Sequence, residues 1–344
     1  MVSFTANGAS CSWTASASGF ISITSGGAGT GNGSVTFNVP ANNIGADRAG
    51  TLTINGQAVS VIQRAYAEVF TDVGPSTYYF DFTDVLSADG ITGGCSLNPP
   101  DFCPNDNVTR AEMAVFIVTG IEGSTFTYTA TPYFTDVPAS NPYFKFIQKL
   151  RDLGITDGCS ATEFCPNDAV TRAEMAAFTI RARYETTPYT YPATPYFTDV
   201  PASDPFFPFI QKMAQVGITG GCAPSLYCPD STITRAQTSV FIVTGLLNQL
   251  LAPGTPVIAA VAPNTAAAGQ TLTVTLTGLN TSFVQGTTQV VLPAGITPSN
   301  VTVSSASSLT VQLAVSSSFV SGPISVLAVT GSQEAVAPNG FTVK

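Results

Sequence analysis

The sequence predicts a multidomain protein of mixed α and β structure, with a β-sandwich at each end and a block of helical repeats between them. Three observations support this expectation. A sequence repeat of about sixty residues occurs three times in the middle of the chain, and both flanking regions alternate apolar and polar residues. In addition, a Pro- and Gly-containing linker at residues 251–256 separates the repeats from the last region. An internal repeat sets the architecture before any single residue is considered.

The first 63 residues form the first predicted sandwich. Four segments alternate apolar and polar residues, as half-buried strands do. The dipeptide Asn55-Gly56 between the last two is a strong signal for a two-residue hairpin. The segments are Phe20–Thr24, Ser34–Val39, Gly50–Asn55 and Ala58–Ile62.

The three repeats follow, and we assign them to residues 64–128, 129–191 and 192–250. Phe-Thr-Asp-Val opens them at Phe70, Phe134 and Phe197, 64 and 63 residues apart. Each continues through Gly-Ile-Thr, a Cys, Cys-Pro and Thr-Arg-Ala-Glu or Thr-Arg-Ala-Gln. In the second repeat, residues 141–153 carry an apolar stripe at helical spacing and end at Gly154, a residue typical of helix C-caps. A second helix is predicted over residues 171–183.

Alternation returns after a Pro- and Gly-containing linker at residues 251–256. Residues 256–344 are rich in Thr, Ser, Val and Gly, and few are aromatic. This pattern predicts a second β-sandwich. Its clearest segments are Gln270–Thr277, Asn300–Ser304, Leu309–Leu313 and Ile324–Val329.

Composition excludes several classes of function. Only 10% of residues are charged and the net charge is −9, so the clustered Lys and Arg needed to neutralise nucleic-acid phosphates are missing. The chain has no histidine, which excludes Ser-His-Asp and Cys-His nucleophiles and His-ligated zinc. Carboxylate-only chemistry remains open. The sequence implies no cofactor and no metal.

Six of the seven cysteines form one short-range pair in each repeat: Cys95/Cys103, Cys159/Cys165 and Cys222/Cys228. Metal or redox chemistry is the alternative, but neither C-x-x-C spacing nor a second tight pair within a repeat is present. We therefore expect three local disulfides, and with them an oxidising, extracytoplasmic setting. Cys11 stands alone and is expected to be a small buried hydrophobe.

No stretch has the ~18 apolar residues of a membrane span. The first residues, Met-Val-Ser-Phe-Thr-Ala, have neither the basic nor the apolar region of a signal peptide. An exported protein needs such a peptide, so we expect that it was removed or that Met1 is not the natural start.

Thr-x-x-Glu at the start of the second helix of a repeat is a capping box, in which Gln can replace Glu. This pattern gives Thr109, Thr171 and Thr234 a structural role, together with Glu112, Glu174 and Gln237. The intervening arginines lie in the first helical turn, where the helix dipole disfavours cations. Either they meet a bound anion, helped by the helix N–H groups, or they form ion pairs with Asp72, Asp136 or Asp199. Both interpretations stay open on physical grounds. The arginines are Arg110, Arg172 and Arg235.

The three ordered motifs resemble S-layer homology (SLH) domains, in a tandem of three over residues 70 to about 245. The resemblance implies a trio of pseudo-threefold arrangement with grooves between the repeats that bind cell-wall polysaccharide, often acidic or pyruvylated. The groove residues that it implies are Asp72, Gly90, Arg110, Asp136, Gly154, Arg172, Asp199, Gly217 and Arg235. The glycines are equally explained as helix caps. The cysteine pairs are not part of the general family pattern, and they either rigidify the adjacent loops or reshape the grooves.

The flanking regions have resemblances of their own. Cys11-Ser-Trp-Thr-Ala, the turn at Gly29–Gly33 and residues 48–63 resemble a BACON domain, an immunoglobulin-like family of bacterial extracellular proteins. Such domains have a strand before the Cys-Trp motif, and only ten residues precede Cys11. We therefore expect the first strand to be missing, either because a neighbouring subunit donates it or because the sequence is truncated. Val261-Ala-Pro and Gly269–Gly278 resemble an immunoglobulin-like IPT/TIG domain.

These observations predict a non-enzymatic, extracellular structural protein of the bacterial cell surface. It would assemble with copies of itself into a layer or filament, dock on cell-envelope polysaccharide, or do both. The alternative is a cell-wall anchoring fragment of a larger secreted enzyme or adhesin. A hydrolase using Asp72 and Asp84 is disfavoured, because no further acid or base group converges on these carboxylates. Aromatic residues that look exposed and could stack on sugar rings are Tyr133, Tyr143, Tyr196, Phe206 and Phe207.

Overall fold

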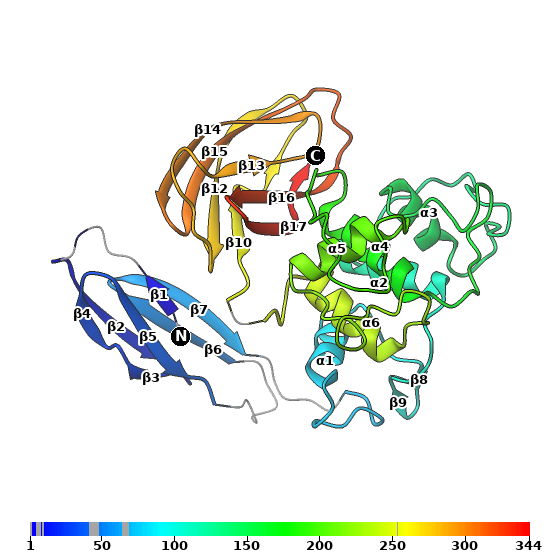
Figure 1. Ribbon diagram of the computed structural model, residues 1–344, viewed down its shortest axis with the longest axis horizontal. Coiled ribbons are helices and arrows are strands. Elements are labelled where there is room, and N and C mark those ends of the chain that lie inside the picture. The colour runs from blue at the N-terminus through cyan, green and yellow to red at the C-terminus, as the bar shows by residue number, and fades with distance from the viewer. Residues whose placement is uncertain (1, 5–7, 9, 41–47, 64–68, 253) are drawn as a thin grey trace. The chain divides into compact units, whose positions relative to one another are not determined.

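The computed structural model describes residues 2–4, 8, 10–40, 48–63, 69–252 and 254–344 (Figure 1). It divides into two compact units, residues 1–68 and residues 69–344. The second unit contains both the repeats and the C-terminal strands, which the sequence had predicted as separate domains. Mixed helix and sheet over several sheets agrees with the predicted fold class.

The N-terminal unit consists of two sheets. β1 (Val2–Phe4), β5 (Gly33–Asn38) and β3 (Ser22–Ser25) form one in that order, and the other has the order β4-β2-β6-β7. Its core contains Trp13, Val35 and Leu52. The strands of the second sheet are β4 (Ala28–Thr30), β2 (Ser12–Ser18), β6 (Arg48–Ile54) and β7 (Gln57–Gln63).

The predicted hairpin joins β6 to β7. Asn55 and Gly56 have φ values of 48° and 81°, as the two central residues of a type I′ turn require. Seven residues of β6 pair with seven of β7, from Arg48 with Gln63 to Ile54 with Gln57. The local turn signal therefore sets the register of this sheet.

Two expectations for the start of the chain differ from the structure. A strand does precede Cys11: β1 pairs antiparallel with Gly33–Val35 at the edge of β5, although it has only three residues. Cys11 is an exposed free thiol and not a buried hydrophobe. Its N–H donates to the carbonyl of Gly8 in a turn before β2, so it does not share the buried strand face that Trp13 occupies.

Each repeat contributes two helices. The first has nine residues: α1 (Phe80–Ala88), α3 (Phe144–Asp152) or α5 (Phe207–Gln215). The second is α2 (Arg110–Glu122), α4 (Arg172–Tyr184) or α6 (Arg235–Phe241), and α6 continues as the π-helical turn η1 (Ile242–Leu246). The first repeat also has a short hairpin of β8 (Ser96–Leu97) and β9 (Pro100–Asp101). No helix among the described residues is long and apolar enough to cross a bilayer.

The three repeats close into a ring through backbone hydrogen bonds. The N–H of Val108 donates to the carbonyl of Ile233 at 3.1 Å, that of Ile233 to Val170 at 2.9 Å, and that of Val170 back to Val108 at 2.9 Å. All three side chains are fully buried in a core to which all three repeats contribute. Each repeat therefore lies between the other two, and three equivalent junctions result.

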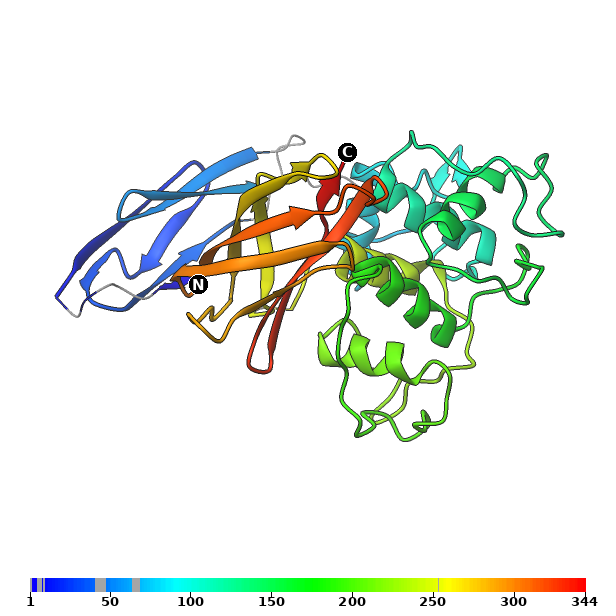
Figure 2. The ribbon, with the colours of Figure 1, turned by 90° about the horizontal axis from the view of Figure 1, so that it is seen from above.

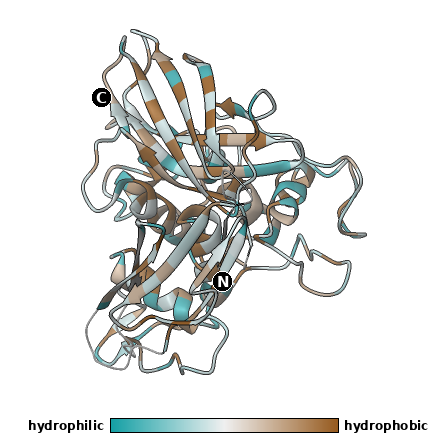
Figure 3. Cartoon of the chain, turned by 90° about the vertical axis from the view of Figure 1, so that its left-hand side faces the viewer, coloured by the Kyte–Doolittle hydropathy of each residue, from teal (hydrophilic) through white to brown (hydrophobic). Residues whose placement is uncertain are grey.

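The C-terminal strands form a sandwich of two four-stranded sheets (Figure 2), of orders β10-β12-β15-β14 and β11-β17-β16-β13. Side chains that alternate between the buried core and solvent give the strands their banded hydropathy (Figure 3). The strands are β10 (Val257–Ala262), β11 (Thr265–Ala266), β12 (Thr271–Leu279), β13 (Gln289–Val291), β14 (Ile296–Ser305), β15 (Ser308–Val315), β16 (Gly322–Thr330) and β17 (Gln333–Val343).

The sheet that contains β16 and β17 packs its outer face on the helical ring. Leu327 and Val336 join the core of the repeats, whereas neighbouring positions such as Val326 face the sandwich interior. β16 is therefore buried on both faces over Ile324–Ala328, which explains its almost continuous apolar sequence. The Ser325 hydroxyl donates to the Arg183 carbonyl at 2.7 Å.

Candidate binding sites between the repeats

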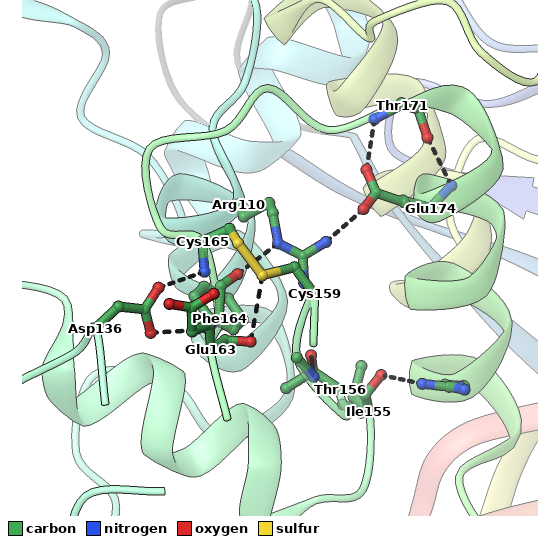
Figure 4. A network of polar contacts seen from close by, with 12 residues as sticks. Arg110, Asp136, Ile155, Thr156, Cys159, Glu163, Phe164, Cys165, Thr171 and Glu174 are labelled. Carbon is green, nitrogen blue, oxygen red and sulfur yellow. Dashed lines mark hydrogen bonds and ion pairs between the residues drawn. A yellow bond between two sulfur atoms is a disulfide. The ribbon is translucent and has the colours of Figure 1, made fainter. Parts of the chain in front are cut away.

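The Asp of each opening motif holds the Cys-Pro loop of its own repeat. Both oxygens of Asp136 accept backbone N–H groups, from Phe164 at 2.8 Å and Cys165 at 2.7 Å (Figure 4). Asp72 and Asp199 make the same contacts in the other repeats. The carboxylates therefore have a structural role in holding these loops.

The three predicted disulfides are confirmed. Cys95–Cys103, Cys159–Cys165 and Cys222–Cys228 are bonded in the Cys-Pro loops. The second cysteine of each pair has a positive φ of 56° to 59°, a region that costs L-residues free energy. Its N–H is one of the two that grip the aspartate, so the covalent link and the carboxylate hold the same piece of backbone.

The capping boxes are also confirmed. The threonine side chain accepts the N–H of Glu112, Glu174 or Gln237, and that side chain bonds back to the threonine N–H. Carbonyl groups of the next repeat accept the first two N–H groups of the helix. In α2, the Arg110 N–H donates to the Asp168 carbonyl at 2.9 Å and the Ala111 N–H to the Pro166 carbonyl at 3.0 Å. Equivalent bonds start α4 and α6. The first-turn N–H groups are therefore occupied and cannot assist an anion, contrary to one of the two interpretations.

Each motif arginine reaches into the following repeat. Arg110 Nε donates to the Phe164 carbonyl at 2.7 Å, and the guanidinium lies 5.0 Å from the centre of the Phe164 ring (Figure 4). Arg172 engages Tyr227 in the same way, and Arg235 engages Phe102 to close the ring. All three arginines are buried, with exposed fractions of 3%, 5% and 6%.

Two of these arginines, Arg110 and Arg235, have the capping glutamate of the next repeat as their acidic partner. Arg110 Nη1 lies 2.6 Å from Glu174 Oε1, and Arg235 Nη1 lies 3.9 Å from Glu112 Oε1. Burial lowers the pKa of Arg235, and the nearby Glu112 charge opposes this shift. The interpretation that pairs them with Asp72, Asp136 or Asp199 has no ion pair within 4.0 Å to support it among the described residues, where those carboxylates accept backbone N–H groups.

The motif glycines end the first helix of each repeat. Gly90, Gly154 and Gly217 have φ values of 69°, 70° and 74°, and the N–H of Ile155 closes the helix on Leu150 at 3.1 Å. This left-handed conformation explains glycine as a C-cap. A Cβ atom at any of the three positions would meet no atom within 4 Å, so the space beside each one is open.

The aromatic residues that the sequence suggested for sugar stacking differ in their exposure. Tyr133 and Tyr196 are 44% and 49% exposed, but Phe207 is buried in the core. Sequence reasoning missed Tyr78, which is 66% exposed and stands where repeats two and three have Pro142 and Pro205. Sequence reasoning also missed the aromatic rings that contact the motif arginines, which are those of Phe102, Phe164 and Tyr227. An aromatic residue before each Cys-Pro was the available signal.

The S-layer homology domain model matches residues 133–176 and 196–239. These matches include the Asp136 and Asp199 loops and the helix starts at Arg172 and Arg235. The chain therefore contains S-layer homology domains at these two positions, in the second and third repeats.

Three curated proteins share sequence with the chain. An amylopullulanase of Thermoanaerobacterium thermosulfurigenes is 29% identical over 205 residues, 58% of this chain and 11% of that protein. Exoglucanase XynX of Acetivibrio thermocellus is 27% identical over 226 residues, 64% of this chain and 20% of the relative. An endoglucanase of Bacillus sp. (strain KSM-635) is 34% identical over 116 residues, 33% and 11% of the two chains. The chain thus spans between about a tenth and a fifth of these relatives.

Proposed function

We propose that the three repeats form one SLH trio that docks the chain on polysaccharide of the bacterial cell envelope, outside the cell and without catalysis. The family match covers the second and third repeats. Residues 64–128 are proposed as the third domain because they repeat the same constellation. Asp72 grips the Phe102 and Cys103 N–H groups, Thr109 and Glu112 form a capping box, and Cys95–Cys103 closes the loop.

The observation that carries the proposal is the buried arginine at each junction between repeats. A guanidinium that lies over an aromatic ring offers a charge to an acidic sugar, and the space beside each helix-capping glycine is open. The proposed binding residues are the nine that the sequence singled out. Asp72, Asp136 and Asp199 shape the loops, Gly90, Gly154 and Gly217 leave room, and Arg110, Arg172 and Arg235 supply charge.

The test is cosedimentation of the oxidised protein with cell walls isolated from a bacterium that carries SLH proteins. We expect the protein to pellet with intact walls and to stay in solution with walls stripped of their polysaccharide. The triple variant Arg110→Ala, Arg172→Ala, Arg235→Ala should lose binding. Arg151→Ala is the matched control, because that arginine is a surface cation paired with Asp157. Equal binding to stripped walls, or unchanged binding by the triple variant, would refute the proposal.

The relatives support the alternative that this chain is the anchoring portion of a larger enzyme. They are an amylopullulanase, an exoglucanase and an endoglucanase, and the matched stretch covers a small share of each. Sequencing the flanking genomic DNA tests this alternative. A catalytic domain in the same reading frame would favour it over a free-standing surface protein.

Self-assembly is a second candidate, with the flanking domains, proposed as BACON-like over residues 1–63 and IPT/TIG-like over 256–344, making lateral contacts. The supporting observation is that β7 is the outer strand of its sheet and, within the part of the chain that the structure describes, pairs along one side only, with β6. Unpaired edges accept strands from neighbouring copies. Electron microscopy at rising protein concentration tests this proposal, and persistent monomers would contradict it.

A further inference from the structure

A cavity of about 250 Å³ lies between the helical repeats and the C-terminal sandwich. Three parts of the second unit form its walls: the end of α4, the residues that follow α5, and the hairpin of β16 and β17. Gly217 and Ser332, which belong to the last two walls, are exposed. The cavity is therefore open to solvent on that side.

Two buried hydrogen-bond donors line this cavity without a partner. Arg183 is 2% exposed and Tyr184 is 0% exposed. Both side chains line the cavity, and neither Arg183 Nε nor the Tyr184 hydroxyl has a hydrogen-bond partner among the described residues. The two groups interact electrostatically, but without the geometry of a hydrogen bond. Because an unsatisfied buried donor is costly, both require an acceptor within the cavity.

The charges around the cavity do not balance. Lys212 and Glu334 pair with each other and cancel. The terminal nitrogens of Arg183 bond only neutral oxygens among the described residues, including the Gly245 carbonyl and Asn248 Oδ1. A guanidinium keeps its charge in proteins. Burial raises the pKa of the Tyr184 hydroxyl, which therefore stays a donor at neutral pH. The wall thus carries one unneutralised positive charge and two donors.

The other repeats lack these donors, so the fold of a repeat does not require them. Arg183 comes twelve residues after the threonine of its capping box, Thr171. The same position holds Ile121 in the first repeat and Leu246 in the third. The arginine is thus particular to the repeat whose second helix ends against the sandwich, where the Ser325 hydroxyl bonds its carbonyl.

We propose that this cavity binds a small oxyanion, a carboxylate or a phosphate. Arg183 Nε and the Tyr184 hydroxyl both donate to the anion, whose charge neutralises the guanidinium. The volume equals that of about eight waters at ~30 Å³ each, which accommodates such an ion with part of its hydration shell. A bound anion contacts repeats and sandwich together and so stabilises their packing. The cavity contains no motif arginine and shares only Gly217 with the polysaccharide sites proposed above.

The test follows the Arg183 Nε–H signal by nitrogen-15 NMR in the full chain, with Arg183→Lys assigning that signal by its loss. The protein is titrated at neutral pH with sodium phosphate or with sodium acetate, and sodium chloride keeps the ionic strength constant. We expect a saturable shift. At ten times the dissociation constant, the thermal midpoint of the second unit should rise by about 3 °C. A response to phosphate alone identifies a phosphate site, and a response to acetate identifies a carboxylate site.

Variants assign the binding to the two donors. Tyr184→Phe keeps the ring and removes one donor, and it should weaken binding about fivefold. Arg183→Leu, which copies the third repeat, should abolish the thermal shift. Tyr189→Phe is the matched control, because its ring packs 4.8 Å from that of Tyr184 but does not line the cavity. This variant should bind as the parent protein does.

Three results would overturn the proposal. One is the absence of a saturable shift with either anion at about 100 mM, far above a millimolar dissociation constant. Another is an equal response to chloride, which would indicate an adventitious ion only. The third is unchanged affinity in Tyr184→Phe, which decides the matter by itself if circular dichroism shows that Arg183→Leu does not fold. The polysaccharide proposal stands or falls separately, since its assay uses the motif arginines.

Discussion

Buried cations occur in two regions of the second unit, and their surroundings differ. Between the helical ring and the sandwich, Lys212 is fully buried and bonds Glu334, the Thr190 carbonyl at 2.9 Å and Gln215 Oε1 at 3.1 Å. Between the repeats, the arginines are buried but their glutamates remain 25% and 33% exposed. Complete enclosure with every donor satisfied makes a structural lock, whereas a half-exposed carboxylate leaves a position that a ligand could occupy.

Arg183 sharpens the contrast, because it has no carboxylate partner among the described residues. Its Nη1 donates to the Gly245 carbonyl at 2.7 Å and its Nη2 to Asn248 Oδ1 at 3.0 Å. Burial lowers its pKa, yet these oxygens satisfy its terminal nitrogens. Arg172 Nε donates to the Tyr227 carbonyl, and its buried Nη2 has no hydrogen-bond partner among the described residues. Each of these two arginines therefore has one buried nitrogen without an acceptor, Nε in Arg183 and Nη2 in Arg172, and only in Arg172 is it a terminal nitrogen.

The largest effect is expected from Glu334→Gln, which leaves the buried charge of Lys212 without its anion. Breaking a buried ion pair from one side costs about 3–5 kcal/mol. Denaturant unfolding followed by near-ultraviolet tyrosine circular dichroism measures this loss in the second unit. Trp13, the single tryptophan, lies in the N-terminal unit, so its fluorescence transition serves as an internal control.

A double variant separates the charge from the packing at the same interface. Lys212→Met with Glu334→Leu removes both ions, and we expect stability within about 1.5 kcal/mol of the parent, since apolar replacement of a buried pair is often neutral. A loss under 1 kcal/mol for Glu334→Gln alone would show that Lys212 is solvated. The claim that the buried Lys212–Glu334 pair stabilises this interface would then be refuted.

The second prediction concerns pH at the same interface. Burial raises the pKa of Glu185 to about 8, and the Ser325 hydroxyl and N–H oppose this rise. Between its ordinary pKa of 4.5 and about 8, the folded state holds the proton that the unfolded state releases. The unfolding free energy therefore falls as pH rises through this window, by at most about 1.4 kcal/mol per pH unit.

Glu185→Gln should remove this slope and stabilise the protein at pH 8 more than at pH 5. Denaturant midpoints at several pH values measure it. Glu163→Gln is the control, because Glu163 is exposed and its removal should leave the slope unchanged. A slope that survives Glu185→Gln would assign the pH dependence to another group.

Local spacing accounts for what the sequence could predict. The Thr109 and Thr171 capping boxes, the Asn55-Gly56 turn and the Cys159–Cys165 bridge each lie within a few residues of chain. The partners of the arginines could not be found in this way. Arg110 and Glu174 are 64 residues apart, and only closure of the three repeats into a ring brings them together.

The packing of the C-terminal sandwich on the helical repeats could not be predicted from the sequence, for a related reason. Periodicity identifies the strand at Ile324–Val329 but not what covers its second face. Ser325 reads as a polar residue on the outer face, yet it is fully buried and bonds Arg183 of α4. Cys11 shows the opposite error, because residue type favours burial and a local turn exposes it.

The smallest expected effects compare the Arg110 junction, where Glu174 lies beside the guanidinium, with the Arg172 junction, where Gln237 holds the equivalent capping position. Glu174→Gln should destabilise the second unit by about 1–2 kcal/mol, because it removes a charged hydrogen-bond acceptor that is only partly exposed. Gln237→Glu should stabilise it by up to about 1 kcal/mol, because it gives Arg172 the missing anion. Thermal or denaturant unfolding of both variants measures these opposite signs. Destabilisation by both would mean that Arg172 is already satisfied, and the distinction between the two kinds of junction would fail.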